Sequence, residues 1–252
     1  MREKTVLRLT LLVLIVSVLT ATFQIQQVRA VSTTIYIRAD GSIDPLTAPI
    51  STSDNVTYTL TDNIASLGDG IVVERNNVTI DGNGFTLHGG GDGRGFNLTS
   101  TDNVTIKNTT IEAFYYGVWQ FSSSNSVITN NYVTANTAYS IYIEKSTNVT
   151  ISNNNVTDNY EYGVEIHQSQ NVNVTGNFIK NNNGDGIYLS ACSEVTLKNN
   201  TLINNGNNLI LWGGRLSQFM HDIDTSNTID GKQSTTLSTN TISLWIHRPI
   251  PA

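Results

Sequence analysis

A repeat of 22 to 25 residues predicts that this 252-residue chain folds as an all-β, right-handed, single-stranded parallel β-helix of about seven coils. Three observations lead to this fold class. Segments that begin with a small or turn-forming residue recur at regular steps, each segment alternates apolar and polar residues, and asparagines recur at equivalent positions. The repeats begin at Gly70, Gly95, Gly117, Ser140, Gly163, Gly186 and Asn208, with steps of 25, 22, 23, 23, 23 and 22 residues.

The first thirty residues have the pattern of a signal peptide. A basic N-terminal stretch precedes an apolar run at residues 9–18, and a Val-Arg-Ala triplet at residues 28–30 suits cleavage before Val31. An uncleaved membrane anchor is the alternative, but the apolar run is short for a spanning helix of ~20 residues. We therefore expect residues 1–30 to be removed on export to the cell surface or the medium, with membrane contact only if they remain.

Charge and cysteine content narrow the range of partners. Removing residues 1–30 takes away four of the 14 basic residues and one of the 20 acidic residues, which leaves 10 against 19 and a net charge of −9. Such a surface repels phosphate backbones, so the sequence predicts no nucleic-acid partner.

Cys192 is the one cysteine and cannot form an intramolecular disulfide, so we expect a buried, inert thiol. No cofactor is predicted.

Residues 31–66 precede the repeats and are expected to cap the N-terminal end, and residues 67–212 are expected to form the β-helix. Period-two alternation buries one face of each strand, and strands this short bury that face only when successive coils stack at ~4.8 Å. The inward residues include Ile71/Val73, Phe96/Leu98, Ile141/Ile143, Val164/Ile166, Ile187/Leu189 and Leu209/Leu211 on the first strand, Val78/Ile80, Val104/Ile106, Val149/Ile151, Val172/Val174 and Val195/Leu197 on the second, and Ile111, Val133, Val156, Ile179 and Leu202 on the third.

Asparagine columns mark the turns between these strands. The columns are Asn130, Asn153 and Asn199; Asn131, Asn154, Asn177 and Asn200; and Asn136, Asn159, Asn182 and Asn205. Asparagine tolerates left-handed backbone conformations, and stacked asparagine side chains can bond to their equivalents one coil away. A leucine-rich repeat has a different Leu/Asn signature, and a β-propeller blade needs nearly twice the repeat length.

The repeats resemble a known group of parallel β-helix proteins. The unit GIYLSACSEVTLKNNTLINN, the opening VTYTLTDNIASLGDGIVVERNNVTIDGNGFTL and the closing HDIDTSNTIDGK are similar to the NosD-like and carbohydrate-binding/sugar-hydrolase (CASH) group, especially to its archaeal secreted members. The resemblance covers about residues 54–232. It implies the fold and leaves the function open, because the repeats encode stacking rather than chemistry.

The C-terminal end departs from this group. We expect residues 213–232 to cap the last coil, and related chains then continue with proline, an apolar residue, two tyrosines and further strands. Here Lys232 is followed by QSTTLSTN, and one set of permissible codons from Gln233, read two nucleotides later, encodes Ile-Tyr-Tyr-Phe-Ile-Asn-Lys-Tyr. We therefore hypothesise that residues 233–252 are an aberrant, poorly packed tail produced by a frameshift, and a natural, weakly structured tail is the alternative.

The outward positions of the first strand form the candidate binding face. Contiguous outward aromatics are typical of binding surfaces, and their rings stack on sugars while carboxylates accept hydroxyl hydrogen bonds. Cross-strand aromatic pairs also stabilise sheets without any ligand, which is the alternative. We expect no cluster of aspartates and no arginine or lysine on this face. The predicted columns are Trp119, Tyr142, Glu165 and Tyr188 in one, and Phe121, Glu144, His167 and Trp212 in the other.

Catalysis is the main alternative use of this face. Glu144 and Glu165 lie on adjacent coils with an offset of two residues, which places their backbones ~8 Å apart. This spacing falls within the ~6.5–9.5 Å range of inverting carboxylate pairs, and His167 would stack one coil from Glu144. A polysaccharide lyase or glycoside hydrolase would use these three residues, although two carboxylates and a histidine also arise easily by chance.

No metal site is predicted. The NosD-like resemblance implies an association with copper-site maturation of a respiratory reductase, but copper handling requires spaced clusters of soft or imidazole ligands. The histidines, Met220 and Cys192 form no repeated motif, and Asp81-Gly82-Asn83-Gly84 fits a tight turn better than a calcium loop.

The sequence thus favours an exported, non-catalytic module that binds glycans or other surface polymers, with polysaccharide cleavage and metallo-enzyme maturation as alternatives.

Overall fold

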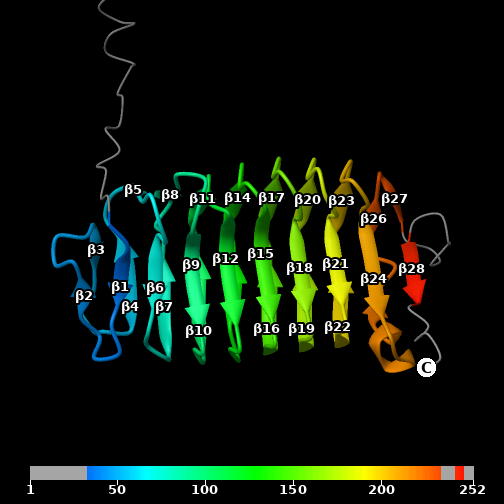
Figure 1. The fold of residues 1–252 in the computed structure, drawn as a ribbon, viewed down its shortest axis with the longest axis horizontal. Coiled ribbons are helices and arrows are strands. Elements are labelled where there is room, and N and C mark those ends of the chain that lie inside the picture. Colours follow the sequence, from blue (N-terminus) through cyan, green and yellow to red (C-terminus); the bar gives the residue numbers. More distant parts are fainter. Residues whose placement is uncertain (1–32, 234–241, 247–252) are drawn as a thin grey trace, which may run out of the picture.

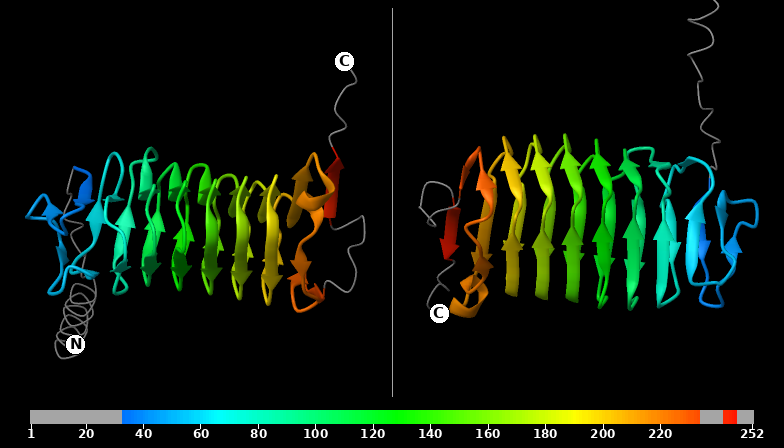
Figure 2. Two further views of the ribbon diagram at one scale, coloured as in Figure 1. Left: turned by 90° about the horizontal axis from the view of Figure 1, so that it is seen from below. Right: turned by 180° about the vertical axis from the view of Figure 1, so that it is seen from behind.

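A computed structural model describes residues 33–233 and 242–246, and the predicted signal peptide lies outside them. In the described part of the chain, three sheets run along one axis and enclose a common interior (Figure 1). Each coil contributes one strand to each sheet, so that strands of successive coils lie side by side, as the further views in Figure 2 also show. The predicted all-β, right-handed parallel β-helix is confirmed, with about eight turns.

Sheet 1 is the ten-stranded sheet of the described chain, and its neighbouring strands are parallel except for β1 and β2. In spatial order its strands are β2 (Ile43–Asp44), β1 (Ile35–Ile37), β6 (Ile71–Val73), β9 (Arg94–Thr99), β12 (Tyr116–Phe121), β15 (Tyr139–Glu144), β18 (Val164–His167), β21 (Ile187–Ser190), β24 (Leu209–Gly213) and β28 (Ile242–Ile246).

Sheets 2 and 3 each contain nine strands within the described residues. Sheet 2 consists of β3 (Ile50–Ser51), β4 (Thr57–Leu60), β7 (Val78–Asp81), β10 (Val104–Lys107), β13 (Val127–Thr129), β16 (Thr147–Ser152), β19 (Gln170–Thr175), β22 (Ser193–Lys198) and β25 (Asp222–Ile223). Sheet 3 consists of β5 (Ile64–Ala65), β8 (Thr86–His88), β11 (Thr110–Glu112), β14 (Tyr132–Thr134), β17 (Asn155–Thr157), β20 (Phe178–Lys180), β23 (Thr201–Ile203), β26 (Thr228–Ile229) and β27 (Lys232–Gln233). A short 3-10 helix, η1 (Leu216–Phe219), follows β24.

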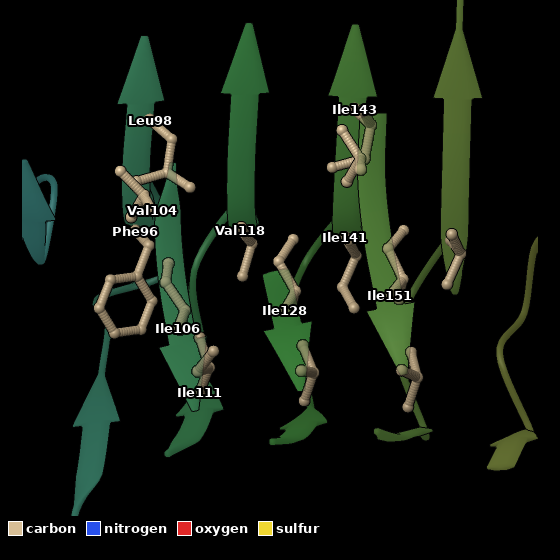
Figure 3. Packing of buried hydrophobic residues seen from close by; sticks show 14 of the residues in the cluster. Phe96, Leu98, Val104, Ile106, Ile111, Val118, Ile128, Ile141, Ile143 and Ile151 are labelled. Atoms are coloured by element: carbon tan, nitrogen blue, oxygen red, sulfur yellow. The ribbon is translucent and has the colours of Figure 1, made fainter. Parts of the chain in front are cut away.

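The interior is a single column of apolar side chains, mostly aliphatic, from all three sheets. Figure 3 shows Phe96, Val118 and Ile141 on neighbouring strands of sheet 1 and Ile128 and Ile151 on sheet 2, and all five are fully buried. The inward residues predicted for the three strands are buried as well, from Ile71 to Leu211. The strand register was therefore predicted correctly, since a shift by one residue would have turned these side chains outward.

Two ladders of asparagines, all buried except the half-buried Asn205, stabilise the turns. They consist of Asn131, Asn154, Asn177, Asn200 and Asn227, and of Asn136, Asn159, Asn182 and Asn205. Within the first ladder, Nδ2 of Asn131 donates to Oδ1 of Asn154 at 3.1 Å, and the backbone N–H of Asn131 donates to the same oxygen at 3.0 Å. The exposed column beside it has φ values of 54° to 55° at Asn130, Asn153 and Asn199, as predicted from the tolerance of asparagine.

The β-helix extends beyond the predicted range of residues 67–212 at both ends. Strands β1, β4 and β5 pair in parallel with β6, β7 and β8, so residues 35–65 complete a further coil. Strands β25 and β26, from the predicted cap at residues 213–232, continue sheets 2 and 3. Segments 38–56 and 214–221 interrupt the regular spacing in these end coils, which is why the repeat alignment did not include them.

Within the described residues, the predicted aberrant tail contains the strand β28 and Gln233, the last residue of β27. The backbone of β28 pairs in parallel with β24, so the expected lack of regular structure is wrong for these five residues. The rest of the tail, residues 234–241 and 247–252, lies outside the described residues. The frameshift hypothesis concerns the nucleotide sequence and stays a prediction. No helix within residues 33–233 or 242–246 is long and apolar enough to cross a membrane.

Candidate functional site

The outer surface of sheet 1 brings the predicted binding residues together. The middle column contains Trp119, Tyr142, Glu165 and Tyr188, and the last column contains Phe121, Glu144, His167, Ser190 and Trp212. Except for Trp212, every predicted residue is half-buried and has another predicted residue directly beside it. Trp212 is 37% exposed and is separated from His167 by Ser190. The patch that these side chains form on β12, β15, β18 and β21, together with the adjoining residues described next, is called the aromatic face below.

A further column, which the sequence analysis missed, completes the aromatic face. It consists of Arg94, Tyr116, Tyr139, Tyr162 and Asp185. Each member directly precedes the small residue that begins a repeat, for example Tyr116 before Gly117. On β12, Gly117 and Val118 are both buried, so Tyr116 and Trp119 emerge on the same side of the sheet. The missed signal was the recurrence of tyrosine before that small residue.

The rings of the aromatic face stack along the axis of the β-helix. Trp119 and Tyr142 are nearly parallel, with centroids 4.7 Å apart, and Tyr139 stacks on Tyr116 at 5.0 Å and on Tyr162 at 5.3 Å. Parallel rings in contact are about 3.5 Å apart perpendicular to their planes, so these rings are offset, and each half-buried ring keeps part of its surface in solvent. Between the first and middle columns, Tyr116 contacts Trp119 edge-to-face at 4.6 Å, and Tyr139 contacts Tyr142 in the same way at 5.3 Å.

Glu165 is the carboxylate at the centre of the aromatic face. It lies between Tyr142 and Tyr188 in the middle column. Its side chain has no hydrogen bond and no ion pair with the described residues. Burial, together with the negative charges of Asp185, Glu144 and Glu161, raises the pKa of Glu165 to about 7. Near neutral pH this group therefore exchanges its proton readily, and as a carboxylate it is poorly solvated.

The tyrosines around Glu165 remain protonated donors. Burial, followed by the charges of Glu144 and Glu165, raises the pKa of Tyr142 far above its usual range. The hydroxyl of Tyr142 donates to Oε2 of Glu144 at 3.2 Å. The face thus combines ring surface, hydroxyl donors and carboxylate acceptors, which are the groups that a polyhydroxylated ligand uses.

The expectation that this face lacks arginine and lysine is wrong. Arg94 lies over the ring of Trp119, with Cζ 4.9 Å from the ring centroid, and its Nη1 pairs with Asp69 at 3.4 Å. Lys145 pairs with Glu144 at 3.3 Å and lies 5.1 Å from the ring of Phe121. Both were missed because Arg94 belongs to the overlooked column and Lys145 occupies the turn after β15.

His167 lies beside Glu144, as predicted, and its Nδ1 is 3.1 Å from the hydroxyl of Ser190. In the described part of the chain, no group of three or more His, Cys, Asp or Glu side chains is arranged to hold a metal ion.

Cys192 is buried, and its thiol donates to the carbonyl of Ile166 at 3.1 Å. Burial raises the pKa of this thiol to about 11, so it is an unreactive thiol at neutral pH.

A second surface feature lies at the corner between sheets 3 and 1. A groove of about 400 Å³ is lined by residues that include Thr137, Asp158, Tyr160, Asn181 and Asn183. The amide of Asn181 donates to Asp158 at 3.0 Å, so these two groups of the lining already pair with each other. Tyr160, 69% exposed, is two residues from Tyr162 of the aromatic face. The groove has fewer rings than the aromatic face and is the weaker candidate.

Solved structures with similar folds include three classes of protein. The pectate lyase Pel9A has a TM-score of 0.50 at 12% identity over 75% of this chain, tailspike protein 2 of an Escherichia coli O157:H7 bacteriophage has 0.49 at 13% over 68%, and the A-module of the Azotobacter vinelandii mannuronan C-5 epimerase AlgE4 has 0.42 at 16% over 67%. The matches cover 62%, 31% and 61% of those chains, so this chain corresponds to part of each. At 12% identity the similarity to Pel9A shows the fold alone.

Curated proteins include no significant match to this chain. A family model described as "right handed beta helix region" matches residues 69–242, which is more than half of the sequence. The matched range contains the complete aromatic face and both asparagine ladders. The chain belongs to the right-handed β-helix family.

Proposed function

We propose that the protein is an exported, non-catalytic β-helix module that binds glycans or other surface polymers on its aromatic face. The observation that carries this proposal is the continuous array of half-buried rings and carboxylates across four adjacent strands. One coil advances by ~4.8 Å, so a polymer that lies along the axis meets a new ring at every coil. The proposed export is based on residues 1–30, and the proposed partner is a polysaccharide rather than a nucleic acid.

The double variant Trp119→Ala/Tyr142→Ala tests this proposal. We expect it to bind the glycans recognised by the wild type about tenfold more weakly or worse, because stacking surface and desolvated contact are lost together. Binding is measured on a glycan array and then by titration calorimetry. The matched control is Tyr132→Ala/Phe178→Ala, which removes two exposed aromatics from sheet 3 and should leave binding unchanged. Equal binding by wild type and Trp119→Ala/Tyr142→Ala would exclude the aromatic face.

Polysaccharide cleavage is the second candidate function, and the proton affinity of Glu165 favours it. A carboxyl group with a pKa of about 7 can act as a general acid or base at neutral pH, and Glu144 and His167 are close by. If the face cleaves polymers, Glu165→Gln should abolish the release of reducing ends or unsaturated products while binding persists. A broad polymer panel without any product would leave the binding module as the function. The third hypothesis, metallo-enzyme maturation, rests on the NosD-like resemblance.

A further inference from the structure

The charges on the aromatic face indicate which glycans it accepts, an inference that rests on the proposed function. Both cations of the face already have carboxylate partners, Arg94 with Asp69 and Lys145 with Glu144. Among the described residues, Glu161, Glu165 and Asp185 have no cationic partner. Asp185 accepts a hydrogen bond from Asn207 at 2.7 Å, whereas the side chain of Glu165 accepts none. Among the described residues, the end of the face formed by β18 and β21 therefore carries these carboxylates without an arginine or lysine, and its basic side chain is that of His167.

Rings and carboxylates occur there together. Glu165 is flanked by Tyr142 and Tyr188 within its column, and Tyr162 contacts Tyr188 at 5.7 Å across columns. An ammonium group is attracted both by a carboxylate and by the π-system of an aromatic ring, and each attraction increases when water is partly excluded. A neutral hydroxyl satisfies the carboxylate less well, and a second carboxylate is repelled.

We infer that the aromatic face selects glycans that carry protonated amines, such as polymers of glucosamine, over neutral glycans and over polyuronates. The amine lies against Glu165, with Glu161 and Asp185 adding longer-range attraction, while the sugar rings stack on the neighbouring tyrosines. Polyuronates meet Glu161, Glu165 and Asp185 without a free arginine or lysine to balance them, so their binding is opposed at this end of the face.

Three oligosaccharides of equal length test the inference: a hexamer of glucosamine, a hexamer of N-acetylglucosamine and a hexamer of galacturonate. Affinities are measured by titration calorimetry on the wild-type protein at pH 7 and low salt, where about half of the Glu165 side chains are ionised before the ligand binds. We expect the glucosamine hexamer to bind about tenfold more tightly than its N-acetylated counterpart, and the galacturonate hexamer to bind most weakly. This preference should shrink at high salt because the attraction is electrostatic.

Two variants, each lacking one negative charge, distinguish an effect of Glu165 from an effect of the net negative charge of the protein. Glu165→Gln should lose most of the preference for the amine while it still binds the N-acetylated hexamer. Glu194→Gln removes the same charge from an exposed residue of β22 in sheet 2 and should keep the preference. Circular dichroism and thermal unfolding establish that both variants are folded.

Each outcome of this experiment decides one claim. Equal affinity for the amine and its acetylated form, tighter binding of galacturonate, or an unchanged preference in Glu165→Gln would overturn the inference while leaving a glycan-binding face. A glucosamine hexamer that binds equally well to Trp119→Ala/Tyr142→Ala would instead contradict the proposed function. A preference that Glu165→Gln removes and Glu194→Gln retains supports the inference.

Discussion

Glu165 connects the chemistry of the aromatic face to the stability of the fold. Its pKa is about 7 in the folded protein and 4.5 for an unperturbed side chain, so between these pH values the unfolded chain loses a proton that the folded chain retains. Stability therefore falls as pH rises through this window and stays lower above pH 7. We expect Glu165→Gln to be about 1 kcal/mol more stable than wild type at pH 8, since partial solvation reduces the penalty.

The stability difference between Glu165→Gln and wild type should be small near pH 4, where Glu165 is mostly neutral in both the folded and the unfolded state. Urea unfolding at pH 4, 6 and 8 measures it, with Glu194→Gln as the control that should show no such trend. A stability difference that is the same at all three pH values would contradict the raised pKa.

Gln120 is a polar side chain at an inward position of sheet 1, among apolar neighbours. It lies between Leu98 and Ile143 on sheet 1, is fully buried, and neither its Nε2 nor its Oε1 has a hydrogen-bond partner. An unsatisfied buried amide costs about 1–3 kcal/mol, so Gln120→Leu should raise the free energy of unfolding by about 2 kcal/mol. Denaturant unfolding checks this value. Gln120→Ala serves as the comparison, because it also removes the unsatisfied amide but leaves a cavity, which lowers stability. A less stable Gln120→Leu variant would show that the amide contributes to folding.

At the scale of single elements, the asparagine ladders carry more stability than their polar composition implies. Asn154 is 1% exposed, donates to the carbonyl of Ile128 at 2.8 Å and accepts from Asn131. We expect Asn154→Ala to cost about 3 kcal/mol, because several buried groups lose their partner at once. The adjacent, exposed Asn153 has φ of 54°, so Asn153→Gly should change stability by less than about 0.5 kcal/mol. Equal losses, measured by chemical denaturation, would contradict the ladder's role.

The strands of the central coils were predictable from sequence, whereas their surroundings were not. Alternation of apolar residues located β15, β18 and β21 and their inward faces, because burial leaves a period of two in the sequence. The column that contains Tyr116 and Tyr139 was missed because two consecutive buried residues, such as Gly117 and Val118, interrupt that period. The pairing of Arg94 with Asp69 joins residues 25 positions apart and depends on the coil geometry, which the alternation does not reveal.

At the scale of the whole molecule, the parallel β-helix converts a sequence period into spatial columns. Residues 22 to 25 positions apart become neighbours, so a single substitution in one repeat alters one point of a long surface. The end coils were predicted less well, because segments such as residues 38–56 break the period although β1 still pairs with β6. The same geometry makes the aromatic face long and flat, which suits an extended polymer better than a small enclosed ligand.

The location of a bound glycan on this surface is the most direct test of the account. The tightest-binding oligosaccharide is titrated into isotope-labelled protein, and the chemical-shift changes of backbone amides and tryptophan indoles are mapped. We predict the largest changes on β12, β15, β18 and β21 and at the indole of Trp119. Largest changes at the corner groove around Tyr160, with the amides of these four strands unaffected, would contradict the assignment of the aromatic face as the binding site.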